Sequence, residues 1–310
     1  MSDRGTPYGY RFMNGYGSHT FKWVNEKGEA FLVKYHFKTD QGIKNFTGDE
    51  AAEMGKKSKD FSTVDLFEAI QKGEFPSWTW YAQIMPIKDA DTYRFDVYDI
   101  TKVWPHSDYP LHKIGKITLN RNPENFHAET EQSAFAPAHF VPGIEASNDK
   151  MLQGRLVNYP DTHRHRLGPN YEQIPINCPY RARMGHYNIR DGFMNINGSN
   201  GSQPNYEPNS ISGTPVQDKA YAIKTEVMVG EAGRYAYQHP NNNYEQPRAL
   251  FRTVFDDAMR AKTIKTISGG LGQCRRDIQE RMLPHFYKID PDYGEGISKA
   301  IGVPVERPRL

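Results

Sequence analysis

The chain has 310 residues, of which 37% are hydrophobic and 13% aromatic, and its formal net charge is +2. This small charge argues against a nucleic acid or a membrane surface as the main partner, and the aromatic content is too high for a disordered protein. Two cysteines, Cys178 and Cys274, exclude a disulfide scaffold and a thiolate metal site and fit a reducing compartment. No stretch reaches the roughly 18 apolar residues of a membrane span, and no secretory signal is visible, so we expect a cytoplasmic protein.

The first third of the sequence predicts strands. The segments His19–Trp23 and Ala30–Phe37 flank Asn25–Gly28, which has the composition of a hairpin turn. Trp78–Met85 and Lys116–Asn120 are further strand candidates because they are rich in aromatic or β-branched residues.

Helical spacing predicts the remaining regular elements. A short helix is expected at Asp49–Lys57, and a second one begins with a capping box at Ser62 and Asp65 and stops at Gly73. A third helix starts near Ser147 and ends at Tyr159, where Pro160 breaks it. Near the carboxyl terminus, Gly269-Gly270 and Pro284 separate three predicted helices, Pro247–Phe255, Asp256–Ile267 and Arg275–Leu283.

The side chains with the clearest chemical meaning lie at the end of the third helix. Arg155 and Tyr159 are four residues apart and therefore share one helix face. A guanidinium beside a phenol favours the phenolate, which is a hard oxygen donor suited to ferric iron. Four positive or titratable groups follow at once, namely His163, Arg164, His165 and Arg166.

Plainer interpretations exist for both features. An isolated Arg/Tyr pair at this spacing is usually a surface hydrogen bond, and a His-Arg-His-Arg run is more often a solvated basic turn. The sequence offers no third or fourth ligand at the spacing of a zinc site. The surrounding sequence decides between these interpretations and a haem site.

Several long segments resemble those of the monofunctional haem catalases of the small-subunit, NADPH-binding type, and they occur in the same order along the chain. In that family a tyrosine is known to ligate the haem iron. The segments that carry the resemblance are Asn14–Lys22, Lys38–Asn45, Lys102–His106, Leu119–Pro123, Gly143–Ser147, Arg155–Tyr171, Asn177–Arg183 and Pro204–Tyr206.

The resemblance implies an α+β fold, the incomplete catalase fold. It would consist of the second half of an antiparallel β-barrel with inserted helices in residues 1–125, a wrapping segment with the haem-ligand helix in 126–245, and a helical domain in 246–310. It also implies a homotetramer that decomposes hydrogen peroxide to water and oxygen in response to oxidative stress.

Site residues are carried over from the family position by position. Tyr159 would ligate the iron, Arg155 would pair with its phenolate, and His19 and Asp149 would continue a buried charge relay. The other implied haem contacts are Met151, His163 and Arg166. The implied NADPH contacts are Ser2, Arg4, Asn14, Tyr16, Lys38, Trp104, His106 and Gln246. Ala249 and Leu250 depart from the family pattern, where a hydroxyl and an aromatic residue contact the nucleotide.

The resemblance begins partway through the family's barrel, and no residue here matches the family's distal histidine and asparagine. We therefore expect this chain to carry the proximal haem side only, and by itself to be weakly active or inactive. Two alternatives stay open: a non-catalytic haem-binding fragment of a catalase, and a catalase-fold enzyme that acts on lipid hydroperoxides.

Overall fold

A computed structural model of the chain describes residues 3–177, 193, 195, 204, 206–213, 215–223 and 243–305. A curled antiparallel sheet lies at its centre, with strand order β5-β4-β3-β2-β6 and with β1 paired to β3 beyond the end of β2. The strands are β1 Gly15–Tyr16, β2 Phe21–Val24, β3 Ala30–Thr39, β4 Ser77–Pro86, β5 His112–Thr118 and β6 Ile144–Ala146. This sheet and the helical carboxy-terminal region confirm the predicted fold class. Within the described ranges, no helix is long and apolar enough to cross a membrane.

The β2–β3 hairpin turns at Asn25–Gly28 as predicted, and Gly28 supplies the positive φ of 75° that the turn requires. Strand β3 sorts its side chains by alternation, since neighbouring residues of a strand point to opposite faces. Phe37 stacks on Trp80 of β4 on one face, with ring centroids 5.6 Å apart. The even-numbered residues from Leu32 to Lys38 therefore lie on the other face. This alternation separates two surfaces with different chemistry.

Two helices follow the β3 strand, and their caps differ from the prediction. Helix α1, Gly48–Lys57, has a capping box in which Thr47 and Glu50 satisfy each other's backbone N–H groups. Helix α2, Phe61–Gln71, begins after Asp60 with no side-chain cap, so the predicted capping box at Ser62 was wrong. Ser62 lies inside the first turn of α2, because the helix starts two residues earlier than the sequence pattern suggested.

Helix α3, Lys150–Leu167, runs through Pro160, so the predicted end at Tyr159 was wrong. A proline inside a helix costs about 3 kcal/mol or more because it removes one hydrogen bond and crowds the preceding turn. Contacts beyond the proline offset this cost: His163 Nε2 donates to the Phe135 carbonyl at 2.8 Å. Arg166 donates to the carbonyls of Glu131 and Ser133 at 2.6 and 2.7 Å. Tertiary contacts thus extend the helix past its sequence signal.

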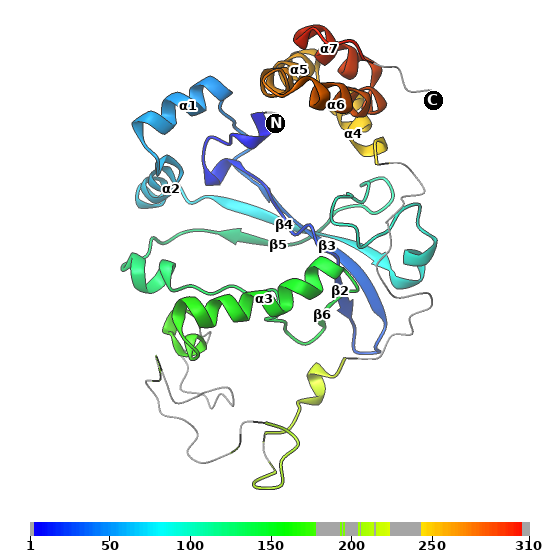
Figure 1. Cartoon of the computed structure of the whole chain (residues 1–310). Helices are drawn as coiled ribbons and strands as arrows, with labels where there is room; N and C mark the ends of the chain where they lie inside the picture. The colour runs from blue at the N-terminus through cyan, green and yellow to red at the C-terminus, as the bar shows by residue number, and fades with distance from the viewer. Residues whose placement is uncertain are drawn as a thin grey trace.

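The carboxy-terminal helices form a separate layer, and Figure 1 shows them on the opposite side of the sheet from α3. They are α4 Glu245–Ala249, which continues into a π-helical turn at Leu250–Val254, α5 Asp257–Leu271, α6 Arg276–Ile289 and α7 Pro291–Ile301. Gly269-Gly270 lies inside α5 and Pro284 inside α6, so the predicted separators were wrong. Helix α7 was not predicted. The helices enclose one apolar cluster that includes Phe251, Leu283 and Ile297.

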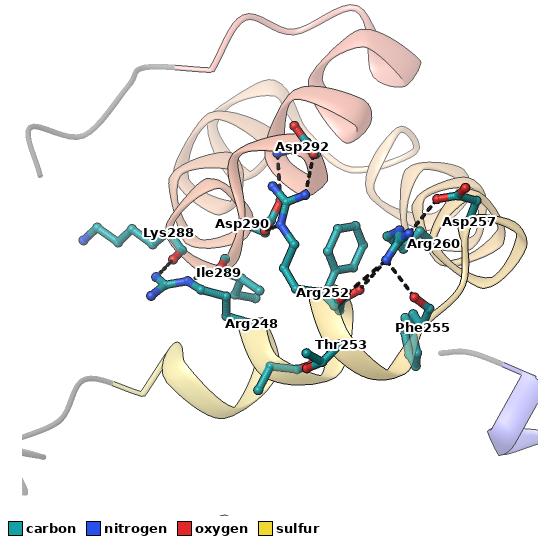
Figure 2. A network of polar contacts seen from close by, with 12 residues as sticks. Arg248, Arg252, Thr253, Phe255, Asp257, Arg260, Lys288, Ile289, Asp290 and Asp292 are labelled. Atoms are coloured by element: carbon teal, nitrogen blue, oxygen red, sulfur yellow. Dashed lines mark hydrogen bonds and ion pairs between the residues drawn. The ribbon is translucent and has the colours of Figure 1, made fainter.

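Two arginines near the start of this layer bind the junction between α6 and α7 (Figure 2). Arg248 donates to the carbonyls of Lys288 and Ile289, which close the last turn of α6. Arg252 pairs with Asp290 and, at 2.8 Å, with Asp292. Because Asp290 also caps α7 by accepting from the Asp292 N–H, one buried carboxylate joins three elements. The helical layer is therefore held by ion pairs around its rim as well as by its core.

Candidate haem site and nucleotide surface

A cavity of about 900 Å³ lies between the sheet and α3. Strand residues with odd numbers form one wall, and α3 and the segment before it form the others. The lining residues used below are Gly17, His19, Phe21, Tyr35, Phe37, Phe135, Ala136, Arg155 and Tyr159. Most of them are apolar or aromatic, which is typical of small-molecule and cofactor sites. This wall could be anticipated from the β3 sequence AFLVKYHFKT, because alternation along a strand places Tyr35 and Phe37 on the same face.

Arg155 and Tyr159 meet inside this cavity. The Arg155 guanidinium donates to the Tyr159 hydroxyl oxygen at 2.7 Å, and its carbon lies 4.7 Å from the Tyr159 ring centroid. Both side chains are half-buried, and the one-turn spacing on α3 brings them together. The hydrogen bond fixes the Tyr159 hydroxyl oxygen on the cavity wall, because its donor is a guanidinium held one helical turn away. The pair therefore presents a positioned oxygen to the cavity.

His19 and Asp149 form a buried pair at the start of α3. His19 Nδ1 lies 2.8 Å from Asp149 Oδ2, and the two residues are 4% and 1% exposed. The other carboxylate oxygen accepts from the Leu152 N–H at 3.0 Å and so caps α3. One aspartate thereby fixes both the helix start and a histidine on the cavity wall. Among the described residues no hydrogen bond links Arg155 to His19, although both line the cavity.

The remaining implied haem contacts lie farther out. His163 is buried against the Phe135 carbonyl, and Arg166 donates to two backbone carbonyls of the same segment. Arg166 also approaches His163 Nδ1 at 3.3 Å. Met151 is 54% exposed on the first turn of α3 and is not among the residues that line the cavity. None of the three lines the cavity, but His163 and Arg166 bind carbonyls of the segment that forms one of its walls.

The even-numbered face of the sheet carries the implied nucleotide residues. Lys38 Nζ donates to the Tyr16 hydroxyl at 3.0 Å, and Asn14 Nδ2 donates to the same oxygen at 3.0 Å. Burial raises the pKa of Tyr16, but the hydrogen bonds from Lys38 and Asn14 and the charges of Lys38 and Arg4 bring it below the usual value. Four of the implied residues therefore share one electropositive cluster, while Ser2 lies outside the described residues.

Three further implied residues lie beside this cluster. The His106 ring lies 5.9 Å from the His36 ring, measured between centroids. His36 was not predicted as a site residue, although alternation along β3 places it on the same face as Lys34 and Lys38. Trp104 is 1% exposed, and its indole N–H has no hydrogen-bond partner among the described residues. Gln246 binds both the N–H and the carbonyl of Val103 at 3.0 Å, which attaches the helical layer to this surface.

Comparison with known proteins gives a single answer. Residues 1–213 match the family described as Catalase, and residues 237–301 match the one described as Catalase-related immune-responsive. The chain is 55% identical over 304 residues to a peroxisomal catalase of Toxoplasma gondii, covering 98% of this chain and 61% of that protein. It is 52% identical over 306 residues to a catalase of Methanosarcina barkeri, covering 99% of this chain and 60% of that protein.

Solved structures agree with the sequence matches. Catalase A from Saccharomyces cerevisiae superposes with a TM-score of 0.88 at 44% identity, covering 97% of this chain and 62% of that chain. A fungal catalase also gives a TM-score of 0.88, at 43% identity, with 97% and 60% coverage. The chain thus spans about 60% of the length of the proteins it matches.

Proposed function

The chain belongs to the catalase family, and from this premise we propose that its α3 cavity binds haem through Tyr159 and serves the decomposition of hydrogen peroxide to water and oxygen. The observation that carries the proposal is the 2.7 Å hydrogen bond from Arg155 to the Tyr159 hydroxyl on the cavity wall. Tyrosine ligation of haem iron uses a phenol oxygen, and this hydrogen bond holds such an oxygen in position on the cavity wall.

The cavity suits a large planar cofactor. Its volume of about 900 Å³ falls at the upper end of cofactor sites, and aromatic walls such as Phe21 and Tyr35 suit an apolar macrocycle. Within the part of the chain that the structure describes, no group of three or more His, Cys, Asp or Glu could hold a bare metal ion. Tyr159 on the cavity wall is the residue that would hold the haem iron.

Each proximal residue has a role that follows from its contacts. When bound, the haem iron supplies the redox chemistry of peroxide decomposition. Arg155 holds the Tyr159 hydroxyl oxygen in position by its hydrogen bond, and Asp149 fixes the start of α3 and orients His19. His163 and Arg166 lie where the family contacts the haem propionates. Arg166 retains unused N–H groups for that purpose, because a guanidinium has five donors.

Reconstitution with haemin tests the proposal. We expect the 310-residue protein to take up haem, and Ala136→Trp, which places a large ring in the cavity, to abolish uptake. Val157→Trp is the matched control, because Val157 is 73% exposed on α3 and does not line the cavity. Equal uptake by both variants would refute the cavity assignment. Oxygen release by the haem-loaded protein would support the catalase reaction, whereas haem uptake without it would favour a non-catalytic haem-binding role.

We propose in addition that the Lys38 cluster binds NADPH. In this cluster the Lys38 ammonium and the Asn14 amide each donate to the Tyr16 hydroxyl at 3.0 Å. Charge-assisted hydrogen bonds of this kind suit a phosphate. Lys38→Ala should weaken NADPH binding about tenfold in a fluorescence titration, and the exposed Lys59→Ala should not. Equal NADPH affinities of the two variants would contradict this assignment of the nucleotide site.

Assembly into a homotetramer is proposed from the family alone. Sedimentation of the purified protein would test it, and a monomer at micromolar concentration would contradict it.

A further inference from the structure

Lys34 is a buried cation that the proposed chemistry leaves without a role. It lies on the even-numbered face of β3, is 5% exposed, and donates from Nζ to the carbonyls of Ser18 and Lys102 at 3.1 Å each. Burial lowers its pKa to about 8, while the charges of Asp149, Asp99 and Asp96 raise it. A lysine is rarely buried to this extent. Its two carbonyl partners indicate what the ammonium does.

The first partner belongs to a strained turn. Ser18 is the one non-glycine residue with positive φ, 59°, among the described residues, and the His19 N–H donates back to the Gly17 carbonyl at 2.6 Å. Three-residue turns with this hand are rare and strained, and they persist only where the surroundings hold them. The bond from Lys34 to the Ser18 carbonyl is such a constraint. It acts on the residue that immediately precedes His19.

The second partner belongs to the nucleotide surface. The Lys102 carbonyl precedes Val103, whose backbone Gln246 binds, and Trp104, whose ring centroid lies 5.4 Å from Lys34 Nζ. One ammonium therefore joins the turn that presents His19 to the segment that carries Trp104. It does so within the electrostatic reach of Asp149, the partner of His19.

We propose that Lys34 is a positioning residue for the His19–Asp149 pair: its ammonium holds the strained Ser18 turn in place and ties that turn to the 102–104 segment of the nucleotide surface. The proposal rests on the proposed function insofar as the pair serves the haem side. Its geometric content concerns the apo chain alone. Loss of the ammonium should release the turn locally, leaving the sheet and α3 folded.

Selective labelling of the 11 histidines gives a simple NMR probe of this turn in the ligand-free protein. In Lys34→Met the His19 amide should exchange with solvent about tenfold faster, the factor expected when a charge-assisted hydrogen bond is lost. Lys34→Arg, which keeps the charge and the donors, should restore most of the protection. Lys22→Met is the matched control, since Lys22 is also 5% exposed but pairs with Glu145. It should leave exchange at His19 unchanged.

Equal acceleration in Lys34→Met and Lys22→Met, or none in Lys34→Met, would overturn the proposal. If Lys34→Met does not fold, Lys34→Gln keeps N–H donors without the charge, and it should give faster exchange at His19 than Lys34→Arg does. A haemin titration of the same variants separates the two levels of the argument. Failure of the wild-type protein to bind haemin would refute the proposed function, while the exchange data would still decide the role of Lys34.

Discussion

Asp149 is predicted to contribute to stability and to the haem side through different oxygens, and two substitutions separate these contributions. Oδ1 accepts from the Leu152 N–H at 3.0 Å and caps α3, whereas Oδ2 lies 2.8 Å from His19 Nδ1. Asp149→Ala removes both contacts. Asp149→Asn keeps an oxygen for the cap but turns an N–H toward His19, so the His19 proton must move from Nδ1 to Nε2.

The magnitudes follow from burial, since Asp149 is 1% exposed. Loss of an N-cap costs about 1 kcal/mol, and a buried histidine left without its partner costs about 1–3 kcal/mol more. Asp149→Ala should therefore lower the free energy of unfolding by about 2–4 kcal/mol. Asp149→Asn should cost only about 1 kcal/mol, because asparagine is as good an N-cap as aspartate.

Urea unfolding followed by tryptophan fluorescence measures both values, and histidine NMR reports the tautomer of His19. Haemin affinity should fall in both variants, because both change the pair on the cavity wall. Equal destabilisation by Asp149→Ala and Asp149→Asn would mean that the cap contributes little. Unchanged haemin affinity in both variants would mean that the His19–Asp149 pair does not contribute to haem binding.

Two further predictions concern the two faces of the sheet. Arg155→Leu should weaken haemin binding and the iron–tyrosine charge-transfer band more than Arg164→Leu does, because Arg155 contacts the Tyr159 hydroxyl and Arg164 is exposed. Equal losses in the two variants would mean that these arginines act only as diffuse positive charge. Burial lowers the pKa of His36 from 6.5 to about 4, against the opposing hydrogen bond with Gln83. The unfolded chain thus binds the proton first, and the free energy of unfolding should fall as the pH drops from 6.5 toward 4. Unfolding of His36→Gln, which does not titrate, should lack this contribution, and an identical pH profile would contradict the assignment.

The sequence predicted the strands more accurately than the helix ends, and the assignment of the site residues stays a prediction. Alternation and a glycine turn define β3 locally, and the one-turn spacing of Arg155 and Tyr159 suffices to bring them together. The continuation of α3 past Pro160 depends on carbonyls 28 residues away in sequence, such as that of Phe135. No local pattern contains such a contact.

Helix α7 was missed because its two glycines lower helix propensity. Close packing requires the first: a Cβ on Gly294 would lie 2.5 Å from the Tyr287 Cα, whereas one on Gly296 would lie 2.7 Å from the end of the Ile264 side chain, which would have to shift. The role of Lys34 was hidden for a similar reason, since a lysine in a strand is indistinguishable from a solvated one until its partners are known. Tertiary contacts, rather than local preferences, decide these positions. The division of the chain into the segments 1–125, 126–245 and 246–310 stays a prediction.

The absorption spectrum of Tyr159→Phe reconstituted with haemin tests the central claim most directly. The substitution removes one oxygen and leaves the cavity walls and α3 unchanged, so circular dichroism should match the wild-type protein. The account predicts that the phenolate-to-iron charge-transfer band disappears and that haem content falls, because the iron loses its ligand. An unchanged charge-transfer band together with unchanged haem content would contradict it.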